Sequence, residues 1–473
     1  MISHGKLSDT AMLDNIGGKM QEERKEQDFG ESTPEKCDKV RDIAENNTEA
    51  KEPNTECDSD LSGNIGDNDS DKEESESADD FTNTEEPEAE DAYEKSEKLA
   101  TGLKVTAVMS VTLAVFAAVM RVCLANEPLA GEVFYRYISR FLQAGMAKLT
   151  SFIPFSLAET VLIMLPLVCI VVFAAVIHSA VRRQAAKLAR LVLCIFTVVC
   201  LVASNYILNL SMLYCRPSLS LLCGISDKDV TADELCASTL YMTYRLSELT
   251  QSGDISFDTR GASVSPYGFE ELEAKIDDAF DKYAENNSWV SPYGAKAKII
   301  AFSDYMTYTH ISGIYTQFTG EANINVNYPD FIVCSTIAHE KAHQRGIAPE
   351  DEANLVAMFV LCESEDPYLE YCGYMSVFDS LARDCRAADS EFYGGVILQC
   401  LPMEVVGELT AYSEFFEKYQ DNKASKVATS ANDAYLKLNG ESEGVVSYDM
   451  VSGMAARYIL QQADARFSVS ATD

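Results

Sequence analysis

The sequence predicts an α-helical membrane anchor of three transmembrane helices, preceded by a disordered acidic tail and followed by a mainly helical (α+β) domain. Three observations support this fold class. Three apolar runs of about 20 residues lie close together in the first half of the chain. Amphipathic helical periodicity recurs in the second half, and acidic residues dominate the start. The expected domains are residues 1–98 (tail), 99–214 (transmembrane region) and 215–473 (C-terminal domain).

The expected tail is strongly acidic and poor in core-forming residues. Residues 1–98 contain 31 Asp and Glu against 11 Lys and Arg, in a chain whose net charge is −36. Such a segment cannot bury enough apolar surface to offset its chain entropy, so we expect disorder. Its charge repels nucleic acid, and we expect no nucleic-acid partner. It acts either as a solubilising tether or as a docking site for a basic cytoplasmic partner.

The apolar runs cover residues 103–125, 157–177 and 188–213. Each is long enough to cross a bilayer core of about 30 Å as a helix. Three such runs in so short a stretch are more typical of a membrane protein than of the buried core helices of a soluble domain. The lipid bilayer is therefore an expected partner.

The loop between the second and third runs indicates the orientation. Residues 178–190 carry four basic side chains and no acidic one, which places this loop in the cytoplasm. The N-terminal tail is then cytoplasmic, and the C-terminal domain is extracytoplasmic, in a multi-pass protein of the cell membrane. Residues 133–142, between the first two runs, are amphipathic and predict a helix that lies in the membrane interface.

The C-terminal domain is expected to be mostly helical. Helical periodicity covers residues 231–249, which Thr231 opens as a possible cap, and residues 268–286. Residues 318–327 alternate like a half-buried strand, whose edge could pair with an extended peptide. Further helices fill residues 375–467, with loops expected at Gly394-Gly395 and Asn439-Gly440.

The sequence His339-Glu340-Lys341-Ala342-His343 has the spacing of a metal site. On a helix, the two histidines lie one turn apart and can bind one ion, while Glu340 can reach a water on that ion. We expect Ser335 or Thr336 to begin this helix. The chain has only five histidines, two of them here.

Gly346 is expected to end the motif helix. The pattern also occurs by chance, and the alternative is an exposed helix with surface histidines. The apolar residues 331–334 just before the motif indicate burial instead. Buried histidines beside a glutamate need a metal or a hydrogen-bond partner.

A catalytic zinc takes three protein ligands and keeps one position open for water. The next helix, expected at residues 349–362, has Glu350, Ala353, Asn354 and Ala357 on one face. Glu350 is therefore the expected third ligand, with Glu352 as the alternative and Asp351 third. Asn354 could orient a ligand histidine through its other ring nitrogen. Candidates for stabilising an oxyanion are Tyr315, His310 and Arg345.

The chain resembles a bacterial family of multi-span membrane proteins, classed as a domain of unknown function, with a zincin-like C-terminal domain. The resemblance covers about residues 106–460. It rests on residues 153–159, 214–217, 318–323, 339–354, 434–437 and 444–448. It implies a zincin-like domain in a bacterial cell membrane and supplies no substrate. The spacing from Glu350 to Asn354 is similar to the third-ligand helix of glutamate-type zincins, which often carry Asp where this chain has Asn354.

These observations lead to two functional hypotheses. The first is a membrane-anchored, zinc-dependent peptidase that cleaves peptides or envelope proteins, with Zn²⁺ bound by His339, His343 and Glu350. A water activated by zinc would attack the peptide bond, with Glu340 as general base. The alternative is a catalytically inactive zincin-fold membrane protein that acts as a binding or signalling module. An intramembrane protease is disfavoured, because His339 lies about 125 residues beyond the last apolar run.

Overall fold

The computed structural model describes residues 85–226, 229–420, 422–439 and 451–470. The tail expected at residues 1–98 therefore lies mostly outside the described residues. Its last part does not: helix α3 (Glu85–Leu124) begins inside the expected tail, so regular helix starts before the predicted boundary at residue 99.

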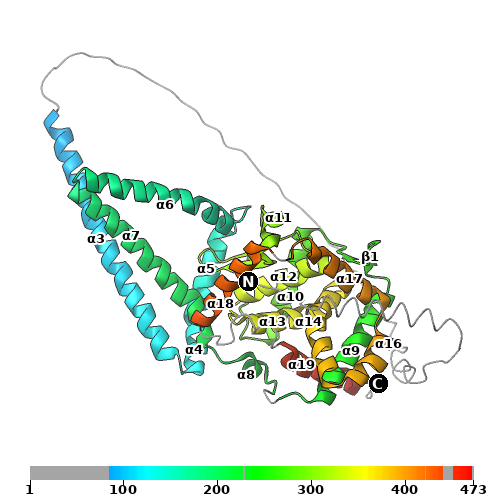
Figure 1. Ribbon diagram of the computed structural model, residues 1–473. Helices are drawn as coiled ribbons and strands as arrows, with labels where there is room; N and C mark the ends of the chain where they lie inside the picture. Colours follow the sequence, from blue (N-terminus) through cyan, green and yellow to red (C-terminus); the bar gives the residue numbers. More distant parts are fainter. Residues whose placement is uncertain (1–84, 227–228, 421, 440–450, 471–473) are drawn as a thin grey trace, which may run out of the picture. The chain divides into compact units, whose positions relative to one another are not determined.

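The described residues include three helices that are long and apolar enough to cross a membrane, seen as α3, α6 and α7 in Figure 1. They cover Glu97–Leu124, Leu157–Val181 and Ala185–Cys215, in agreement with the three predicted runs. The third combines α7 (Ala185–Tyr206) with the short turns η2 (Ile207–Ser211) and η3 (Leu213–Cys215). None of the most apolar window of α6 is buried by protein, as expected for a helix that faces lipid.

The segment between the first two spans is amphipathic, as predicted. It comprises α4 (Pro128–Phe134), η1 (Tyr135–Ser139) and α5 (Arg140–Thr150). One face is apolar and exposed, with Tyr137 and Leu149 more than two-thirds exposed. The other face is buried, and Ser139 and Gln143 there donate hydrogen bonds to the carbonyl oxygens of Leu208 and Asn209. These bonds fasten the segment to the end of the third span.

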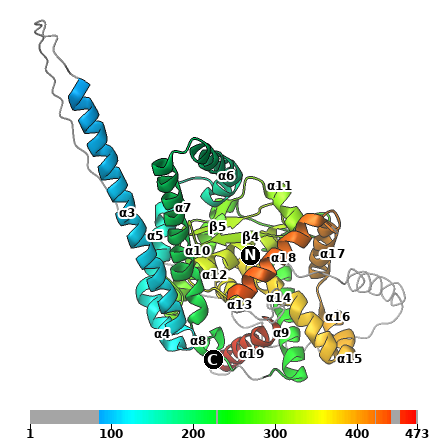
Figure 2. The same ribbon diagram turned by 60° about the vertical axis from the view of Figure 1, so that its left-hand side comes forward.

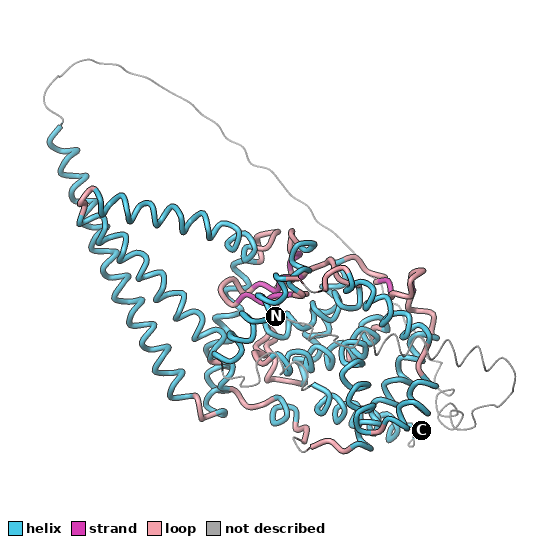
Figure 3. Tube along the Cα trace, in the orientation of Figure 1, coloured by secondary structure: helices cyan, strands magenta, loops and turns pink. Residues whose placement is uncertain are grey.

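The C-terminal domain is a cluster of helices (Figure 3). These helices surround one large apolar core. Thr231 forms a capping box with Glu234 at the start of α9, as its position predicted. The helices are α8 (Leu219–Cys223), α9 (Ala232–Gln251), α10 (Phe269–Asn286), α11 (Ser303–Met306), α12 (Asp330–Gln344), α13 (Glu350–Cys362), α14 (Pro367–Ala388), α15 (Ser390–Phe392), α16 (Leu398–Cys400), α17 (Met403–Glu417), α18 (Lys423–Asn439) and α19 (Val451–Ser470). Short turns are η4 (Thr307–Thr309) and η5 (Tyr393–Ile397).

Two loop predictions had different outcomes. The loop expected at Gly394-Gly395 is wrong, because both glycines lie inside η5, a wide helical turn that continues α15. The helix that precedes Asn439-Gly440 does end at Asn439, and Gly440 lies outside the described residues.

The strands form two small sheets among the helices. β1 (Ser256–Phe257) pairs with β2 (Ser263–Val264), and a second sheet has the order β3-β5-β4. In the second sheet β5 (Glu321–Ile324) runs parallel to β3 (Lys298–Ile299) and antiparallel to β4 (Gly313–Thr316). The predicted strand at 318–327 thus exists, but the expectation that its edge binds a peptide is wrong. Both of its edges are already paired, and β3 and β4 form the two edges of the sheet.

The second span is attached to this sheet by two carboxylates, of which Glu321 is buried and Glu159 is partly exposed. Glu321 of β5 accepts hydrogen bonds from the backbone N–H groups of Leu157 and Ala158, at distances of 3.2 and 2.8 Å. It also pairs with the buried Lys298. In return, Glu159 of α6 accepts from the N–H groups of Ala301 and Phe302, both at 2.9 Å. The first turn of α6, where unpaired N–H groups favour anions, is therefore fixed to the sheet.

Candidate metal centre

The motif lies on α12, a helix buried along its whole length. Every residue from Phe331 to Gln344 is buried, which confirms the burial inferred from the preceding apolar residues. The expected start at Ser335 or Thr336 is wrong. The helix begins at Asp330, directly after Pro329, and the apolar residues 331–334 form its first turn. The apolar run is thus part of the helix, rather than a segment that precedes it.

Two charged residues of the motif, Lys341 and Arg345, point away from the histidines toward α10. The Lys341 ammonium lies 2.7 Å from Glu273 and 2.9 Å from Asp277. The Arg345 guanidinium lies 2.7 Å from both Asp277 and Asp281. Burial opposes ionisation of Asp277, but the adjacent Lys341 and Arg345 cations hold its pKa below the usual range. These pairs orient α12 about its axis and turn the histidines to the opposite side.

The same contacts remove Arg345 as a candidate for stabilising an oxyanion. His310 is also engaged elsewhere, because its Nε2 lies 2.7 Å from the carbonyl oxygen of Tyr419 and its ring packs edge-on against Phe416.

The end of α12 is held by the membrane-proximal segments. Gly346 ends the helix with φ +101°, as predicted, and a Cβ there would lie 2.2 Å from the Tyr135 hydroxyl oxygen. Tyr135 Oη donates to the carbonyl oxygen of Arg345 at 2.7 Å. Arg216, just after the third span, donates to the carbonyl oxygen of Gly346 at 2.6 Å and stacks over Tyr135. A cation and a hydroxyl thus satisfy carbonyl groups at the negative end of the helix.

Helix α13 brings the third candidate ligand to the histidines. Ala353 and Ala357 are buried on the face toward α12, and such small side chains permit close approach. Glu350 Oε2 lies 3.1 Å from His339 Nε2 and 3.2 Å from His343 Nε2. The two Nε2 atoms are 3.0 Å apart. His339, His343 and Glu350 form a buried group suited to hold a metal ion.

The two other acidic candidates on α13 point elsewhere. Glu352 Oε1 accepts a hydrogen bond from the backbone N–H of Leu219 at 2.7 Å, at the start of α8. Asp351 accepts from the backbone N–H of Glu352 at 2.8 Å. Neither joins the histidine group, so the structure places the first choice, Glu350, at the site and the alternative Glu352 outside it.

The hydrogen bonds at Nδ1 determine whether each histidine directs a lone pair or an N–H group from Nε2 toward Glu350. The Ile347 carbonyl can only accept, so His343 Nδ1–H donates to it at 2.7 Å. His339 Nδ1 lies 2.8 Å from Asn354 Oδ1, the orienting contact expected from the spacing. In their neutral forms, both imidazoles therefore direct the lone pair of Nε2 toward the Glu350 carboxylate. Three electron-pair donors at 3.0–3.2 Å repel one another unless a cation lies among them.

The three donor atoms fit zinc in type and spacing. Zinc takes His nitrogen and carboxylate oxygen at about 2.0–2.1 Å, and a tetrahedral ion with such bonds keeps its ligands roughly 3.3 Å apart. The observed separations of 3.0–3.2 Å are close to this value. A single proton could bridge only two of the three atoms, whereas a metal ion binds all three.

The electrostatics of the group also favour a cation. Burial lowers the pKa of His339 to about 3, so its ring is neutral. Burial tends to raise the pKa of Glu350. The facing His343 and the hydrogen bonds from both histidines nevertheless hold this pKa well below the usual range. Glu350 is therefore an ionised carboxylate without exposure to water. Burial also tends to lower the pKa of His343, but Glu350 outweighs it and raises that pKa.

Glu340 lies between α12 and the edge strand β4. It is fully buried, and burial raises its pKa. The neighbouring backbone of Tyr315 acts in the opposite sense and favours the ionised form. A Cβ at Gly313 would lie only 2.6 Å from Glu340 Oε1, so the glycine makes room for this carboxylate. Figure 2 shows β4 and β5 beside α12.

The alternation of β4 explains this contact. Ser312 O accepts from Asn325 N, and Thr316 O accepts from Gly320 N, so residues of this parity direct their backbone groups toward β5. Gly313 and Tyr315 have the opposite parity and direct theirs to the free edge. Glu340 therefore lies close to the free edge of the sheet, beside the candidate metal-ligand group.

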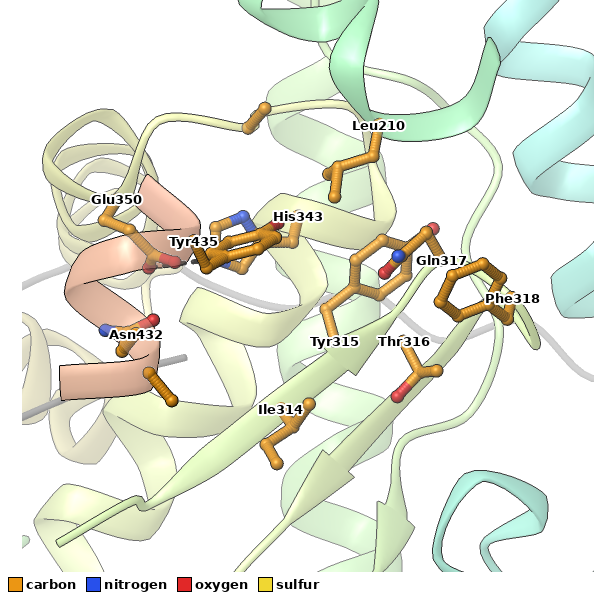
Figure 4. A pocket seen from close by; sticks show the side chains of 12 residues that line it. Leu210, Ile314, Tyr315, Thr316, Gln317, Phe318, His343, Glu350, Asn432 and Tyr435 are labelled. Atoms are coloured by element: carbon orange, nitrogen blue, oxygen red, sulfur yellow. Dashed lines mark hydrogen bonds and ion pairs between the residues drawn. The ribbon is translucent and has the colours of Figure 1, made fainter. Parts of the chain in front are cut away.

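A cavity of about 280 Å³ opens beside the histidines (Figure 4). His343 and Glu350 line it together with Tyr315, whose ring stacks on that of His343 at 6.3 Å. Of the three candidates for oxyanion stabilisation, Tyr315 is therefore the one at the site. The other lining residues are Leu210, Ile314, Thr316, Gln317, Phe318, Ala348, Ala431, Asn432 and Tyr435.

Sequence reasoning missed the contributions of Leu210, Asn432 and Tyr435 to this cavity. These residues come from the end of the third span and from α18, far from the motif in sequence. No local spacing links them to His339. A signal existed only for Tyr435, which lies in one of the stretches that carry the family resemblance.

Comparison with known proteins supports one part of the resemblance noted in the sequence, the membership of a family of unknown function. Searches of curated proteins and of solved structures gave no match. A family model described as a protein of unknown function, DUF3810, matches residues 131–455, well over half of the chain's 473 residues. The matched region includes two of the three candidate spans, the candidate metal-ligand group and α18. The chain therefore belongs to the DUF3810 family.

Proposed function

We propose that the chain is a membrane-anchored zinc peptidase. The observation that carries the proposal is the convergence of His339 Nε2, His343 Nε2 and Glu350 Oε2, with both Nδ1 atoms engaged in other hydrogen bonds. This arrangement supports a bound Zn²⁺. When bound, Zn²⁺ would lower the pKa of a water molecule and polarise the substrate carbonyl group.

Glu340 is suited to act as the general base. Its carboxylate lies on the same helix as both histidines, and its close packing on Gly313 of β4 keeps it near the cavity that Tyr315 lines. In this role Glu340 takes a proton from the attacking water and later gives it to the leaving amine. The Tyr315 ring is suited to position the substrate, and the phenol hydroxyl is the group that could stabilise its developing negative charge.

The edge of β4 is suited to bind an extended peptide. Its outward backbone groups can pair with a substrate strand, and the cavity begins directly beside them. The basic loop between the second and third spans supports an extracytoplasmic location for this site. Peptides or envelope proteins are then the substrate classes within reach.

The raised pKa of His343 supports a second candidate function. The raised pKa of His343 means that a proton could supply the positive charge facing Glu350. In that case the domain would be a binding or signalling module without catalysis. The two functions differ in metal content and in the effect of replacing Glu340.

The test compares peptide hydrolysis by the purified full-length protein and by its Glu340→Gln variant, both with measured zinc content. We expect Glu340→Gln to keep its zinc and to lose at least about 100-fold in rate, because the base is removed and the ligands remain. Glu408→Gln is the control. Glu408 is also a fully buried glutamate with a pKa raised by burial, but it contacts Ser263 and Tyr371 outside the site. Equal activity of wild type and Glu340→Gln would contradict the proposal.

A further inference from the structure

The wall of the cavity includes a residue of the third membrane span. Leu210 lies in η2, inside the continuous apolar helix Ala185–Cys215, and lines the same cavity as His343 and Glu350. Counting about 20 residues outward from Arg190, the last basic residue of the connecting loop, brings the far boundary of the bilayer core to about Leu210. The candidate metal centre therefore lies at the level where this span leaves the bilayer.

An apolar cluster continues from the span into the site. Leu210 and Leu213 are buried together with Tyr135 and with Ala348, which follows the motif helix. Tyr435 of α18 packs against this cluster and also lines the cavity. The cavity is thus built directly on the end of the span, without an intervening polar layer.

The amphipathic segment α4–α5 marks the same level independently. Its exposed apolar side chains continue into the following loop, where Phe152 is 79% exposed and Phe155 is 54% exposed. Arg136 and Lys148 lie among them, the mixture expected of a helix at a membrane surface. The bilayer is the occupant suited to this face, because the face is continuous with the first two spans at both ends.

The turn between β4 and β5 rests on this segment. Thr150 Oγ1 donates to the carbonyl oxygen of Thr319 at 2.8 Å. Gly320 packs so closely on α5 that a Cβ there would lie 2.5 Å from the backbone nitrogen of Ala147. Phe318, next in the turn, is partly exposed and lines the cavity. The Phe318 end of the cavity therefore faces the membrane surface.

The edge strand leads from the candidate metal centre to that surface. Tyr315 lies beside Glu340 near the end of β4, and Phe318 lies three residues further along the chain, in the turn that follows this strand. A peptide can pair with β4 in either direction. In both cases one terminus of the peptide leaves the site beside Phe318. That end points toward the bilayer.

We infer that the site takes the juxtamembrane segment of a polypeptide anchored in the same bilayer and cuts it within a few residues of the membrane. The inference rests on the peptidase function proposed above. Tethering in the bilayer raises the effective concentration of such a substrate at a site on the membrane surface. A soluble peptide does not gain this increase in effective concentration. It must also enter a cavity of which α18 forms one wall.

The test uses the zinc-loaded full-length protein in liposomes. The substrates carry a randomised cassette joined to a single transmembrane helix through Gly/Ser spacers of roughly 2, 8 and 20 residues, and the same cassette is also supplied without a helix. We expect the short-spacer substrate to be cut with a kcat/KM at least about ten times that of the soluble cassette. The cut should fall at a constant distance from the helix, whatever the cassette sequence.

Equal kcat/KM for tethered and soluble cassettes would overturn the inference and leave the peptidase function intact. Cleavage of none of the substrates would contradict the peptidase function itself, and with it the inference as a statement about cleavage. The two failures are therefore distinct.

A binding measurement without turnover completes the test. In the Glu340→Gln variant, a photoreactive phenylalanine derivative at Phe318 should crosslink to the short-spacer tethered substrate and far less to the soluble cassette. The same group at Met403, an exposed residue of α17 outside the cavity, should crosslink to neither. Equal crosslinking of tethered and soluble cassettes at Phe318 would again overturn the inference.

Discussion

At the scale of single residues, the candidate centre depends on which nitrogen of each histidine carries the proton. The carbonyl of Ile347 fixes His343, and Asn354 performs the same role for His339. Both bonds leave Nε2 bare and aimed at Glu350. The geometry thus arises from two ordinary hydrogen bonds to Nδ1, one from the backbone and one from a side chain.

Asn354→Leu should weaken zinc binding by about 10- to 100-fold, because His339 loses the partner that fixes its tautomer and ring orientation. Asn354→Asp should bind zinc at least as well as the wild type, since a carboxylate accepts the same hydrogen bond. Competition with a chelator of known affinity measures both. Unchanged affinity in Asn354→Leu would contradict the role given to this contact.

The sequence was sufficient to predict which side chains form the candidate ligand group, because they follow helical spacing. His339 and His343 are one turn apart, and Glu350 and Asn354 share a face of the next helix. The choice of Glu350 over Glu352 could be argued from that face alone. Spacing could not place Tyr315 rather than His310 or Arg345 at the site, because those positions depend on packing between distant elements.

At the scale of elements, the motif helix is oriented by charged residues that the sequence alone left unexplained. Lys341 and Arg345 depart from the usual uncharged or apolar residues of such motifs. The structure gives the reason, since α10 presents Glu273, Asp277 and Asp281 to them. These long-range pairs turn the histidine face of α12 toward α13 and β4.

Lys341→Met should destabilise the domain by about 3–5 kcal/mol, because the ammonium is fully buried and its removal strands the Glu273 carboxylate. Lys437→Met is the matched control. Its pair with Asp433 is a half-exposed helix pair, so its loss should cost no more than about 0.5 kcal/mol. Denaturant unfolding of both variants measures the difference, and equal stabilities would show that the α10 contacts do not hold the motif helix.

The three-stranded sheet could be predicted from the sequence only in part. The alternating pattern of residues 318–327 correctly predicted a strand, since alternation follows from the strand's own geometry. Strand order is a property of the assembled sheet, so the pattern could not reveal that β5 is central. The edge strand β4 was not predicted, because its four residues are too few to show an alternating pattern, although Ile314, Tyr315 and Thr316 are residue types that favour strands.

At the scale of the whole molecule, the membrane-proximal segments and the candidate metal centre form one connected structure. Tyr135 and Arg216 bind carbonyl oxygens at the end of α12, and Glu132 joins them by accepting from Arg216 at 2.7 Å. His343 lies three residues before Gly346, so these contacts end one turn from a candidate ligand. The length and apolarity of the spans could be predicted from sequence, but these contacts could not.

Arg216→Met should increase hydrogen exchange of the amides around Gly346 and Ile347, because it removes hydrogen bonds to the carbonyl oxygens of Gly346 and Trp289. Arg136→Met is the control, since Arg136 pairs with the same Glu132 but is itself partly exposed. Mass-spectrometric exchange on the full-length protein compares the two. Equal exchange at these amides would mean that the membrane segments do not hold the end of the motif helix.

The central claim is that His339, His343 and Glu350 bind one zinc ion, and the most direct test is the zinc content of purified full-length protein. Wild type should contain about one zinc per chain, and Glu350→Gln less than about a tenth of that amount. Glu352→Gln, the same change two residues away at a carboxylate that binds the Leu219 N–H, should keep the full equivalent. Absence of zinc from the wild type, or equal zinc in Glu350→Gln and wild type, would contradict the account.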